Sequence, residues 1–424
     1  MGIEDGFKET EIGPIPVDWE VVPLQEAATF TRKPRGLNLA DHEAIPFIPM
    51  ALVPDNSTLI EQYELRPGDS IRSGTYCERG NILLAKITPS FENGKQGIVG
   101  DLPLDFAYAT TEVYPIQARP GCLDQMFLFH FLRLPNVRAD IAGKMEGSTG
   151  RQRVPRAVIE NYPIPLPPLP EQRRIAHVLS AIQRAIAAQD DLIAAAREVK
   201  RSLMQRLFTY GPGPEPAPTK ETEIGEIPEH WEVVRLGEVA DKPQYGYTAS
   251  ASQHPVGPKF LRITDIQNGR VSWLSVPFCE IDERGLTKYR LEPGDLLFAR
   301  IGATTGKTYL VTECPSSIFA SYLIRVRVKS ERLLPGYAHY FTNTETYWRQ
   351  IDAAKGGRLK KGVNIPVLSS LLLPLPPLCE QHEISHSLSA LDRKIETEEQ
   401  RKAALQELFK SMLHQLMTGQ VRLK

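Results

Sequence analysis

The chain has 424 residues, of which 42% are hydrophobic and 24% are charged, and its formal net charge at pH 7 is −1. This composition is typical of an ordinary folded protein, and the length predicts two or three domains. The sequence has no run of about 18 apolar residues and no secretory signal pattern, which excludes a membrane-spanning helix and predicts a cytoplasmic protein.

The first element along the chain is a segment that returns later. Residues 9–28 read ETEIGPIPVDWEVVPLQEAA, and residues 221–240 read ETEIGEIPEHWEVVRLGEVA, with fourteen of twenty positions identical. A second segment, PLPPLPEQRRIAHVLSA at 165–181, returns as PLPPLCEQHEISHSLSA at 374–390, with twelve of seventeen identical. Because both pairs have nearly the same offset and order, the chain is a tandem duplication.

The residues between these matched segments differ between the halves. Short alternating apolar runs, bounded by Gly, Pro and Asn, predict β-strands at 45–50, 81–87 and 111–118, and at 259–266, 295–301 and 321–328. Two of them, NILLAKI (81–87) and DLLFARI (295–301), remain similar. We therefore predict an α+β fold with one globule in each half, over 1–164 and 221–373.

Each globule is followed by a predicted long helix, over 165–210 and 374–424, and the linker 211–220 separates the first helix from the second globule. Apolar residues recur in both helices at the 4-3 spacing of a coiled coil. This seam is interrupted at Gln189, Lys200, Glu398 and Lys402. Because the linker is short, the second helix must return along the first, so we expect an antiparallel pair holding two globules apart. The alternative is two amphipathic helices that each pack on their own globule.

The doubled pattern resembles the specificity subunit of type I restriction–modification systems. The opening motif has Glu11–Gly13, Ile15–Pro16 and Trp19–Val22, repeated as Glu223–Gly225, Ile227–Pro228 and Trp231–Val234. The exit motif has Pro165–Leu169 with Glu171–Gln172, repeated as Pro374–Leu378 with Glu380–Gln381.

The resemblance implies two target recognition domains, each of which reads one half of a split double-stranded DNA site. It also implies that the helices set the gap and dock two methyltransferase (M) subunits, and that restriction (R) subunits join the full complex. This chain would then carry no catalytic residue, cofactor or metal, whereas S-adenosylmethionine, ATP and Mg are expected on the partners. A related bipartite system with a fused nuclease–methylase partner is the nearer alternative.

Local charge gives candidates for DNA contact, although the net charge does not. A Gly-rich basic loop precedes each helix, GSTGRQRVPR at 147–156 and GGRLKKG at 356–362. Such loops suit phosphate contact and guanine reading. The full set of candidates is Lys86, Lys95, Arg151, Gln152, Arg153, Arg156, Arg262, Arg300, Thr304, Thr305, Lys307, Arg358, Lys360 and Lys361.

Two motifs suggest enzymes. His382–His386 fits HExxH, so a zinc hydrolase with coiled-coil dimerisation is the alternative from another class, but no third zinc ligand has recognisable spacing. IGATTGKT at 301–308 is one residue short of a phosphate-binding loop, and we expect a hairpin tip there. The five cysteines are scattered without a CxxC pair, so no disulfide framework or zinc knuckle is expected.

Overall fold

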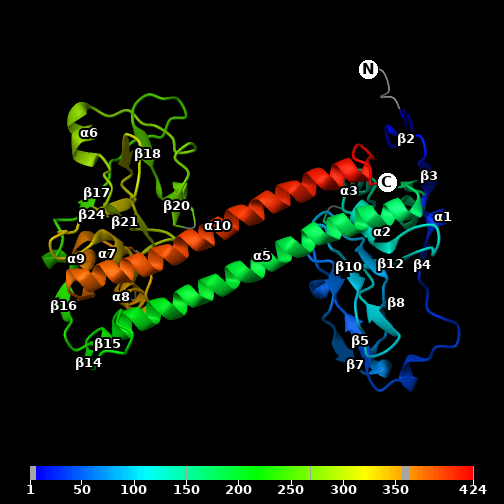
Figure 1. Ribbon diagram of the computed structural model, residues 1–424, viewed down its shortest axis with the longest axis horizontal. Coiled ribbons are helices and arrows are strands. Elements are labelled where there is room, and N and C mark those ends of the chain that lie inside the picture. Colours follow the sequence, from blue (N-terminus) through cyan, green and yellow to red (C-terminus); the bar gives the residue numbers. More distant parts are fainter. Residues whose placement is uncertain (1–5, 149, 268, 356–361, 424) are drawn as a thin grey trace. The chain divides into compact units, whose positions relative to one another are not determined.

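The computed structural model describes residues 6–148, 150–267, 269–355 and 362–423, and Figure 1 shows their helices and strands. The chain divides into two compact units, here called unit 1 (Met1–Leu192 with Glu398–Lys424) and unit 2 (Ile193–Thr397). Each unit holds one globule, a stretch of the long helix α5 (Leu169–Tyr210) and a stretch of the long helix α10 (Leu378–Met417). Among the described residues, no helix is long and apolar enough to cross a membrane.

The globule of unit 1 consists of the strands β1 (Phe7–Lys8), β2 (Ile15–Pro16), β3 (Glu20–Pro23), β4 (Ala28–Phe30), β5 (Ile45–Ile48), β6 (Leu59–Ile60), β7 (Glu64–Arg66), β8 (Thr75–Glu78), β9 (Ile82–Ala85), β10 (Gln96–Val99), β11 (Phe106–Ala109), β12 (Val113–Ala118) and β13 (Pro163–Leu166), and of the helices α1 (Leu24–Ala27), α2 (Gln125–Phe131), α3 (Pro135–Ala142) and α4 (Arg156–Glu160). Its two larger sheets have the orders β4-β12-β9-β10-β6 and β7-β5-β11-β8. The central strand β9 has antiparallel neighbours on both sides. It is buried throughout because its alternate side chains pack into two cores, Ile82 and Leu84 into one and Leu83 into the other.

The globule of unit 2 consists of the strands β14 (Thr219–Thr222), β15 (Gly225–Pro228), β16 (Glu232–Arg235), β17 (Gln244–Tyr245), β18 (Lys259–Leu261), β19 (Ile266–Gln267), β20 (Arg270–Val271), β21 (Leu296–Ala299), β22 (Thr308–Leu310), β23 (Ser317–Phe319), β24 (Leu323–Val326) and β25 (Leu372–Leu375), and of the helices α6 (Glu283–Tyr289), α7 (Pro335–Phe341), α8 (Glu345–Lys355) and α9 (Ile365–Ser370). Its largest sheet has the order β17-β24-β21-β22, and β18 pairs in parallel with β23.

The two globules share one plan, which confirms the predicted duplicated α+β fold. The order β4-β12-β9-β10 in unit 1 corresponds to β17-β24-β21-β22 in unit 2, and the parallel pair β5–β11 corresponds to β18–β23. The similar runs 81–87 and 295–301 form the central strands β9 and β21. The predicted strand 259–266 is shorter than expected: β18 ends at Leu261, because the Asp265 carboxylate accepts from the main chain of Arg262 and closes a helical turn.

The opening and exit motifs of each half meet in the structure. β3 pairs antiparallel with β13, and β16 pairs antiparallel with β25. The fully buried indole of Trp19 donates its Nε1–H to Glu171 (3.3 Å), and that of Trp231 donates to Glu380 (2.9 Å). The repeated residues therefore fasten the start of β3 and of β16 to the start of the long helix that follows each globule.

The glutamine of each exit motif makes a second fastening. Oε1 of Gln172 accepts from the main-chain N–H of Asp124 at 2.8 Å, and Oε1 of Gln381 accepts from that of Leu334 at 2.8 Å. Nε2 of each glutamine donates to two main-chain carbonyls. Both side chains are buried, so their amides satisfy buried main-chain groups that water cannot reach.

The long helices run in opposite directions within unit 1. Ile175 and Leu179, near the start of α5, share a hydrophobic core with Leu413 and Leu416, near the end of α10. In Figure 1 the red end of α10 lies beside the green start of α5. The end of α10 thus packs on the globule that precedes α5, so the alternative of each helix packing only on its own globule is wrong.

Unit 2 repeats this antiparallel arrangement. Leu207, near the end of α5, shares a core with Ile384 and Leu388, near the start of α10. Closer to the middle of both helices, Ile193 and Ile395 form a small cluster with Ala196. The predicted antiparallel pairing is therefore confirmed inside each unit.

The polar residues that interrupt the seam form hydrogen bonds or ion pairs with residues of the opposite helix. In unit 1, Nε2 of the buried Gln189 donates to the buried carboxylate of Glu398 (2.6 Å), and Lys402 forms an ion pair with Asp190 (2.5 Å). In unit 2, Lys200 pairs with Asp392 (2.6 Å). Each pair specifies which turn of α5 faces which turn of α10.

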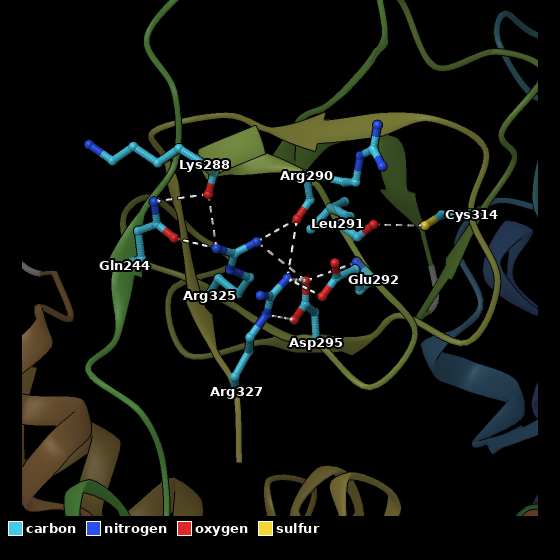
Figure 2. A network of polar contacts seen from close by, with 9 residues as sticks. All are labelled: Gln244, Lys288, Arg290, Leu291, Glu292, Asp295, Cys314, Arg325 and Arg327. Carbon is cyan, nitrogen blue, oxygen red and sulfur yellow. Dashed lines mark hydrogen bonds and ion pairs between the residues drawn. The ribbon is translucent and has the colours of Figure 1, made fainter. Parts of the chain in front are cut away.

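A buried ionic network ties four segments of unit 2 together (Figure 2). Asp295, just before β21, is 2% exposed and accepts from Nε of Arg327, just past β24, at 2.6 Å. The neighbouring Arg325 donates to the main-chain carbonyls of Lys288 and Arg290, at the end of α6, and to the side chain of Gln244 on β17. The network holds α6 against the sheet.

Candidate nucleic-acid interface

The predicted basic loop of unit 1 lies against the end of the central strand β9. Just past β9, the main-chain N–H of Lys86 donates to the carbonyl of Glu112 (3.0 Å), which precedes β12. The carbonyl of Lys86 accepts from the N–H of Val154 (2.8 Å), and Ile87 forms an isolated bridge with Arg153. Three segments far apart in sequence thus meet at one edge of the sheet.

Unit 2 makes the same main-chain contacts at the end of β21. The N–H of Arg300 donates to the carbonyl of Tyr322 (3.1 Å), and its own carbonyl accepts from Val363 (2.8 Å). Ile301 forms an isolated bridge with Gly362. We call this arrangement the crossing frame; it consists of 86–87, 112 and 153–154 in unit 1, and of 300–301, 322 and 362–363 in unit 2.

The crossing frame of unit 1 carries charged side chains. Arg153 donates Nε and Nη2 to the two carboxylate oxygens of Glu112 at 2.9 and 2.8 Å. This hydrogen bond lowers the pKa of Glu112 despite the carboxylate's partial burial. The ammonium of Lys86 lies 4.9 Å from the centre of the Tyr114 ring. Partial burial lowers its pKa, although Glu112 acts in the opposite direction.

The crossing frame of unit 2 carries aromatic and apolar side chains around one arginine. The Arg300 guanidinium lies 4.8 Å from the centre of the Tyr245 ring, and its Nη1 donates to the carbonyl of Ser321 (3.3 Å). Tyr245, Ile301 and Tyr322 are exposed, with Tyr322 at 52%. Such exposed aromatic groups beside a cation favour contact with a ligand.

A hollow of about 350 Å³ opens beside this frame, and Tyr322 and Arg262 both line it. Arg262 is held there by Asp265, to which Nε and Nη2 donate at 3.0 and 2.8 Å. Two of the cations predicted for unit 2, Arg262 and Arg300, are therefore brought to neighbouring places around Tyr322 and Ser321.

The predicted residues at the β9–β10 and β21–β22 turns have different environments. Lys95 uses its ammonium inside the globule, since Nζ donates to the carbonyls of Met50 (3.0 Å) and Val53 (2.9 Å). Lys307 occupies the equivalent place in unit 2, and its side chain is exposed. Thr304 accepts from the N–H of Lys307 through its main-chain carbonyl, and the buried Thr305 donates its hydroxyl to Gly302.

The remaining predicted residues lie in or beside the basic loops. Arg151 is exposed, Gln152 is half-buried, and Arg156 forms an ion pair with Glu160 (2.7 Å) over the ring of Phe30. The predicted residues Arg358, Lys360 and Lys361 lie outside the described residues.

The two enzyme-like motifs occupy places that explain their composition. His382 and His386 are exposed on α10, while Ile384 between them is buried in the seam. The described residues contain no group of three or more His, Cys, Asp and Glu that could hold a metal ion. IGATTGKT joins the antiparallel strands β21 and β22, so the prediction of a hairpin tip is confirmed.

Sequence reasoning missed Glu112 and Tyr322, the members of the crossing frame that precede β12 and β24. A signal was available, because the runs TEVYPIQA (111–118) and SYLIRVRV (321–328) were both predicted as strands. When these runs are aligned end to end, Glu112 falls opposite Tyr322. Because Glu and Tyr are different residues, only their equivalent positions in the two runs show that they correspond.

Known proteins resemble both halves of this chain in sequence. The family described as the type I restriction modification DNA specificity domain matches residues 16–196 and again residues 228–407. The chain belongs to this family. Each match covers most of one globule and part of one long helix.

Several members of the family align with nearly the whole chain. The specificity subunit of the type I restriction enzyme MjaVIII from Methanocaldococcus jannaschii is 27% identical over 437 residues, covering 99% of this chain and 97% of the relative. That of EcoEI from Escherichia coli is 24% identical over 495 residues, covering 94% of this chain and 81% of the relative.

Solved structures share the fold. A chain from a study of complex assembly and conformational transition in a type I restriction–modification system aligns with a TM-score of 0.57 at 20% identity, covering 96% of this chain and 99% of the other. The type I restriction–modification S subunit from M. genitalium aligns with a TM-score of 0.57 at 10% identity, covering 98% of both chains.

Proposed function

We propose that this chain is the DNA-reading subunit of a type I restriction–modification assembly, and that each globule reads one half of a bipartite site. The observation that carries the proposal is the double match to the DNA specificity domain, with one match on each globule. The crossing frames support it, because they keep the same main-chain contacts while their side chains differ. Two similar readers with different surfaces suit an asymmetric site with an unread gap.

The long helices are proposed to set the gap and to dock two methyltransferase subunits, with restriction subunits joining the full complex. Leu192 and Val199 on α5 are exposed, and their spacing of seven residues places them on one face of the helix. Leu408 on α10 is exposed as well. Apolar side chains on an otherwise polar helix surface favour packing against an apolar face of another protein.

The chemistry is proposed to lie on the partners. The chain itself would catalyse no reaction. It would bind DNA in the cytoplasm. The methyltransferase subunits would hold S-adenosylmethionine, and the restriction subunits would use ATP and Mg. Its contribution is to select the sequence at which those subunits act.

The proposal is tested by methylation with and without a partner. The purified chain alone should not methylate DNA, whereas the chain with its methyltransferase subunit should methylate a split sequence that methylated-DNA sequencing identifies. Methylation by the chain alone, or unspecific methylation by the assembly, would contradict the proposal. A partner that carries nuclease and methylase on one polypeptide would assign the chain to the related bipartite class.

A further inference from the structure

The crossing frames place one arginine in each unit so that part of its guanidinium is held and part is left for a ligand. A guanidinium has five N–H donors in a planar fork. In unit 1, Arg153 gives Nε–H and one Nη2–H to Glu112, which leaves both N–H groups of Nη1 and one of Nη2. The Arg153 side chain is 50% exposed, so this free end of the fork can meet a ligand.

Unit 2 reaches the same result with other neighbours. Arg300 gives one Nη1–H to the carbonyl of Ser321 and lies over the ring of Tyr245. Its Nε is buried and makes no hydrogen bond to a described residue, so Nε cannot face a ligand in solvent. The free donors are again the outer ones, on Nη1 and Nη2.

The partner chemistry that fits two parallel outer N–H groups is an edge with two neighbouring acceptors. In the major groove, guanine offers such an edge through O6 and N7, and arginine binds it with two hydrogen bonds. A phosphate also accepts such a fork, but phosphate contacts carry no sequence information. Holding the arginine in advance reduces the side-chain entropy lost on binding, which favours a contact that must distinguish bases.

We infer that each half-site contains a guanine read by the arginine of the crossing frame, Arg153 in unit 1 and Arg300 in unit 2. Glu112 is then a positioning residue, because it touches Arg153 and aims its fork without contacting the base. This inference rests on the proposed function and adds the base that each globule reads at this place. Other paired arginines, such as Arg66 with Glu64 on β7, lie outside the frame.

The experiment uses the full chain assembled with its methyltransferase subunit. Methylation rates are measured on a panel of duplexes in which each base pair of the wild-type site is replaced in turn. Arg153→Ala should reduce the preference for guanine at one position of one half-site by about tenfold to a hundredfold. Arg300→Ala should do the same at one position of the other half-site. Arg153→Lys should lose most of the preference too, since an ammonium has no fork.

The role of Glu112 has its own readout. Glu112→Ala should weaken the preference at the same base pair as Arg153→Ala, and should add little to it in the double variant because the two residues act as one unit. Glu112→Gln, which keeps an acceptor, should have a smaller effect. The controls Arg66→Ala in unit 1 and Arg284→Ala on α6 in unit 2 should leave every base preference unchanged. In each variant, unchanged preferences at the other positions of the same half-site report that the altered globule is folded.

Three results would decide against the inference. Unchanged base preferences in both arginine variants would overturn the inference. The proposed function would survive that result, because the wild-type assembly would still methylate a specific sequence. Equal weakening on every sequence would assign the arginines to phosphates and would overturn it as well. A wild-type assembly without sequence-specific methylation would instead reject the proposed function, and the inference with it.

Discussion

Asp295 and Asn81 occupy equivalent places before the central strands β21 and β9. They make similar contacts in the two halves, but with different chemical groups. Each accepts a main-chain N–H from the residue three positions earlier, at 3.0 and 2.9 Å. Asn81 donates to Gln117 on the neighbouring strand β12 (2.9 Å), whereas Asp295 accepts from Arg327, just past the neighbouring strand β24. A neutral amide pair in unit 1 thus corresponds to an ion pair in unit 2.

Asp295→Asn should therefore destabilise unit 2 by about 1–3 kcal/mol, because it takes the carboxylate away from the buried Arg325 guanidinium, while the partly exposed Arg327 keeps Glu292 as a partner. Asp295→Asn combined with Arg327→Gln recreates the amide pair of unit 1 and should be less destabilised than the single variant. Urea unfolding of both variants measures the two free energies. If the double variant were the less stable one, the amide pair would not replace the ion pair in this unit.

Glu171 makes the stability of unit 1 depend on pH. Burial acts to raise the pKa of this carboxyl, but hydrogen bonds from Arg422 and Trp19 outweigh it, so the pKa is lowered from its usual 4.5. A lowered pKa in the folded state adds stability above the unfolded pKa, and this stability is lost as the pH falls through the folded value. Glu171→Gln should therefore cost about 1–3 kcal/mol at pH 7 and progressively less below pH 4.5.

Thermal unfolding of the wild type and of Glu171→Gln between pH 3 and pH 7 tests this. The matched control is Glu380→Gln. Glu380 also accepts a hydrogen bond from a buried tryptophan, but its second partner is the imidazole of His230 and not an arginine. A gap between wild type and Glu171→Gln that stays constant over this range would mean that the charge of Glu171 does not contribute.

At the scale of the helices, we expect the Gln189–Glu398 pair to fix the alignment of α5 against α10 and to make unit 1 less stable than an apolar pair would. Replacing both residues by Leu should leave unit 1 equally stable or up to about 4 kcal/mol more stable, because a buried polar pair is often exchanged for apolar packing without loss. Gln189→Leu alone should destabilise by about 1–3 kcal/mol, because it removes a donor from a buried carboxylate. Chemical unfolding of the three proteins gives the comparison, and a double variant less stable than the single one would contradict it.

Much of the fold was predictable because its signals are local or repeated. The matched segments around Trp19 and Trp231 revealed the duplication, and the 4-3 spacing indicated the long helices. The contact between Trp19 and Glu171 was not predictable, since hydrogen bonds across 152 residues leave no local pattern. The early end of β18 at Leu261 was missed because the Asp265 carboxylate, rather than any Gly or Pro, closes the turn.

The candidate interface was predictable only in part. Basic residues stand out in a sequence, so Arg153 and Arg300 were among the candidates. Their partners did not stand out, because Glu112 and Tyr245 acquire a role only when the sheet brings them beside a guanidinium. Lys95 illustrates the opposite case: its charge suggested DNA, yet its ammonium bonds two carbonyls of its own globule.

At the scale of the whole molecule, the helices are predicted to measure the gap between half-sites. Seven residues inserted after Leu192 in α5 and after Thr397 in α10 keep the phase of the seam and lengthen both helices by about 10.5 Å. At about 3.4 Å per base pair, this corresponds to about three base pairs. Sequencing of methylated sites should show unchanged half-sites with a longer gap.

Rotation of the DNA limits this change. Three base pairs turn the double helix by roughly 100°, since one turn takes about 10.5, so the assembly must flex or the shift will be partial. Inserting four residues in each helix is the control, because it breaks the phase of the seam and should abolish methylation. An active seven-residue variant that keeps its original gap would mean that other parts of the assembly set the spacing.

The composition of the two units has a consequence for biosynthesis. Unit 2 is one continuous stretch, Ile193–Thr397, whereas unit 1 needs Glu398–Lys424 in addition to the first 192 residues. Those late residues include Leu413 and Leu416 of its core and Arg422, which pairs with Asp18 and Glu171. During translation, the globule of unit 1 is made before that of unit 2, but part of its apolar core stays uncovered until the residues after 397 have been made, whereas unit 2 has all of its own residues by then. A nascent chain that stops after residue 397 carries all of unit 2 and an unfinished unit 1.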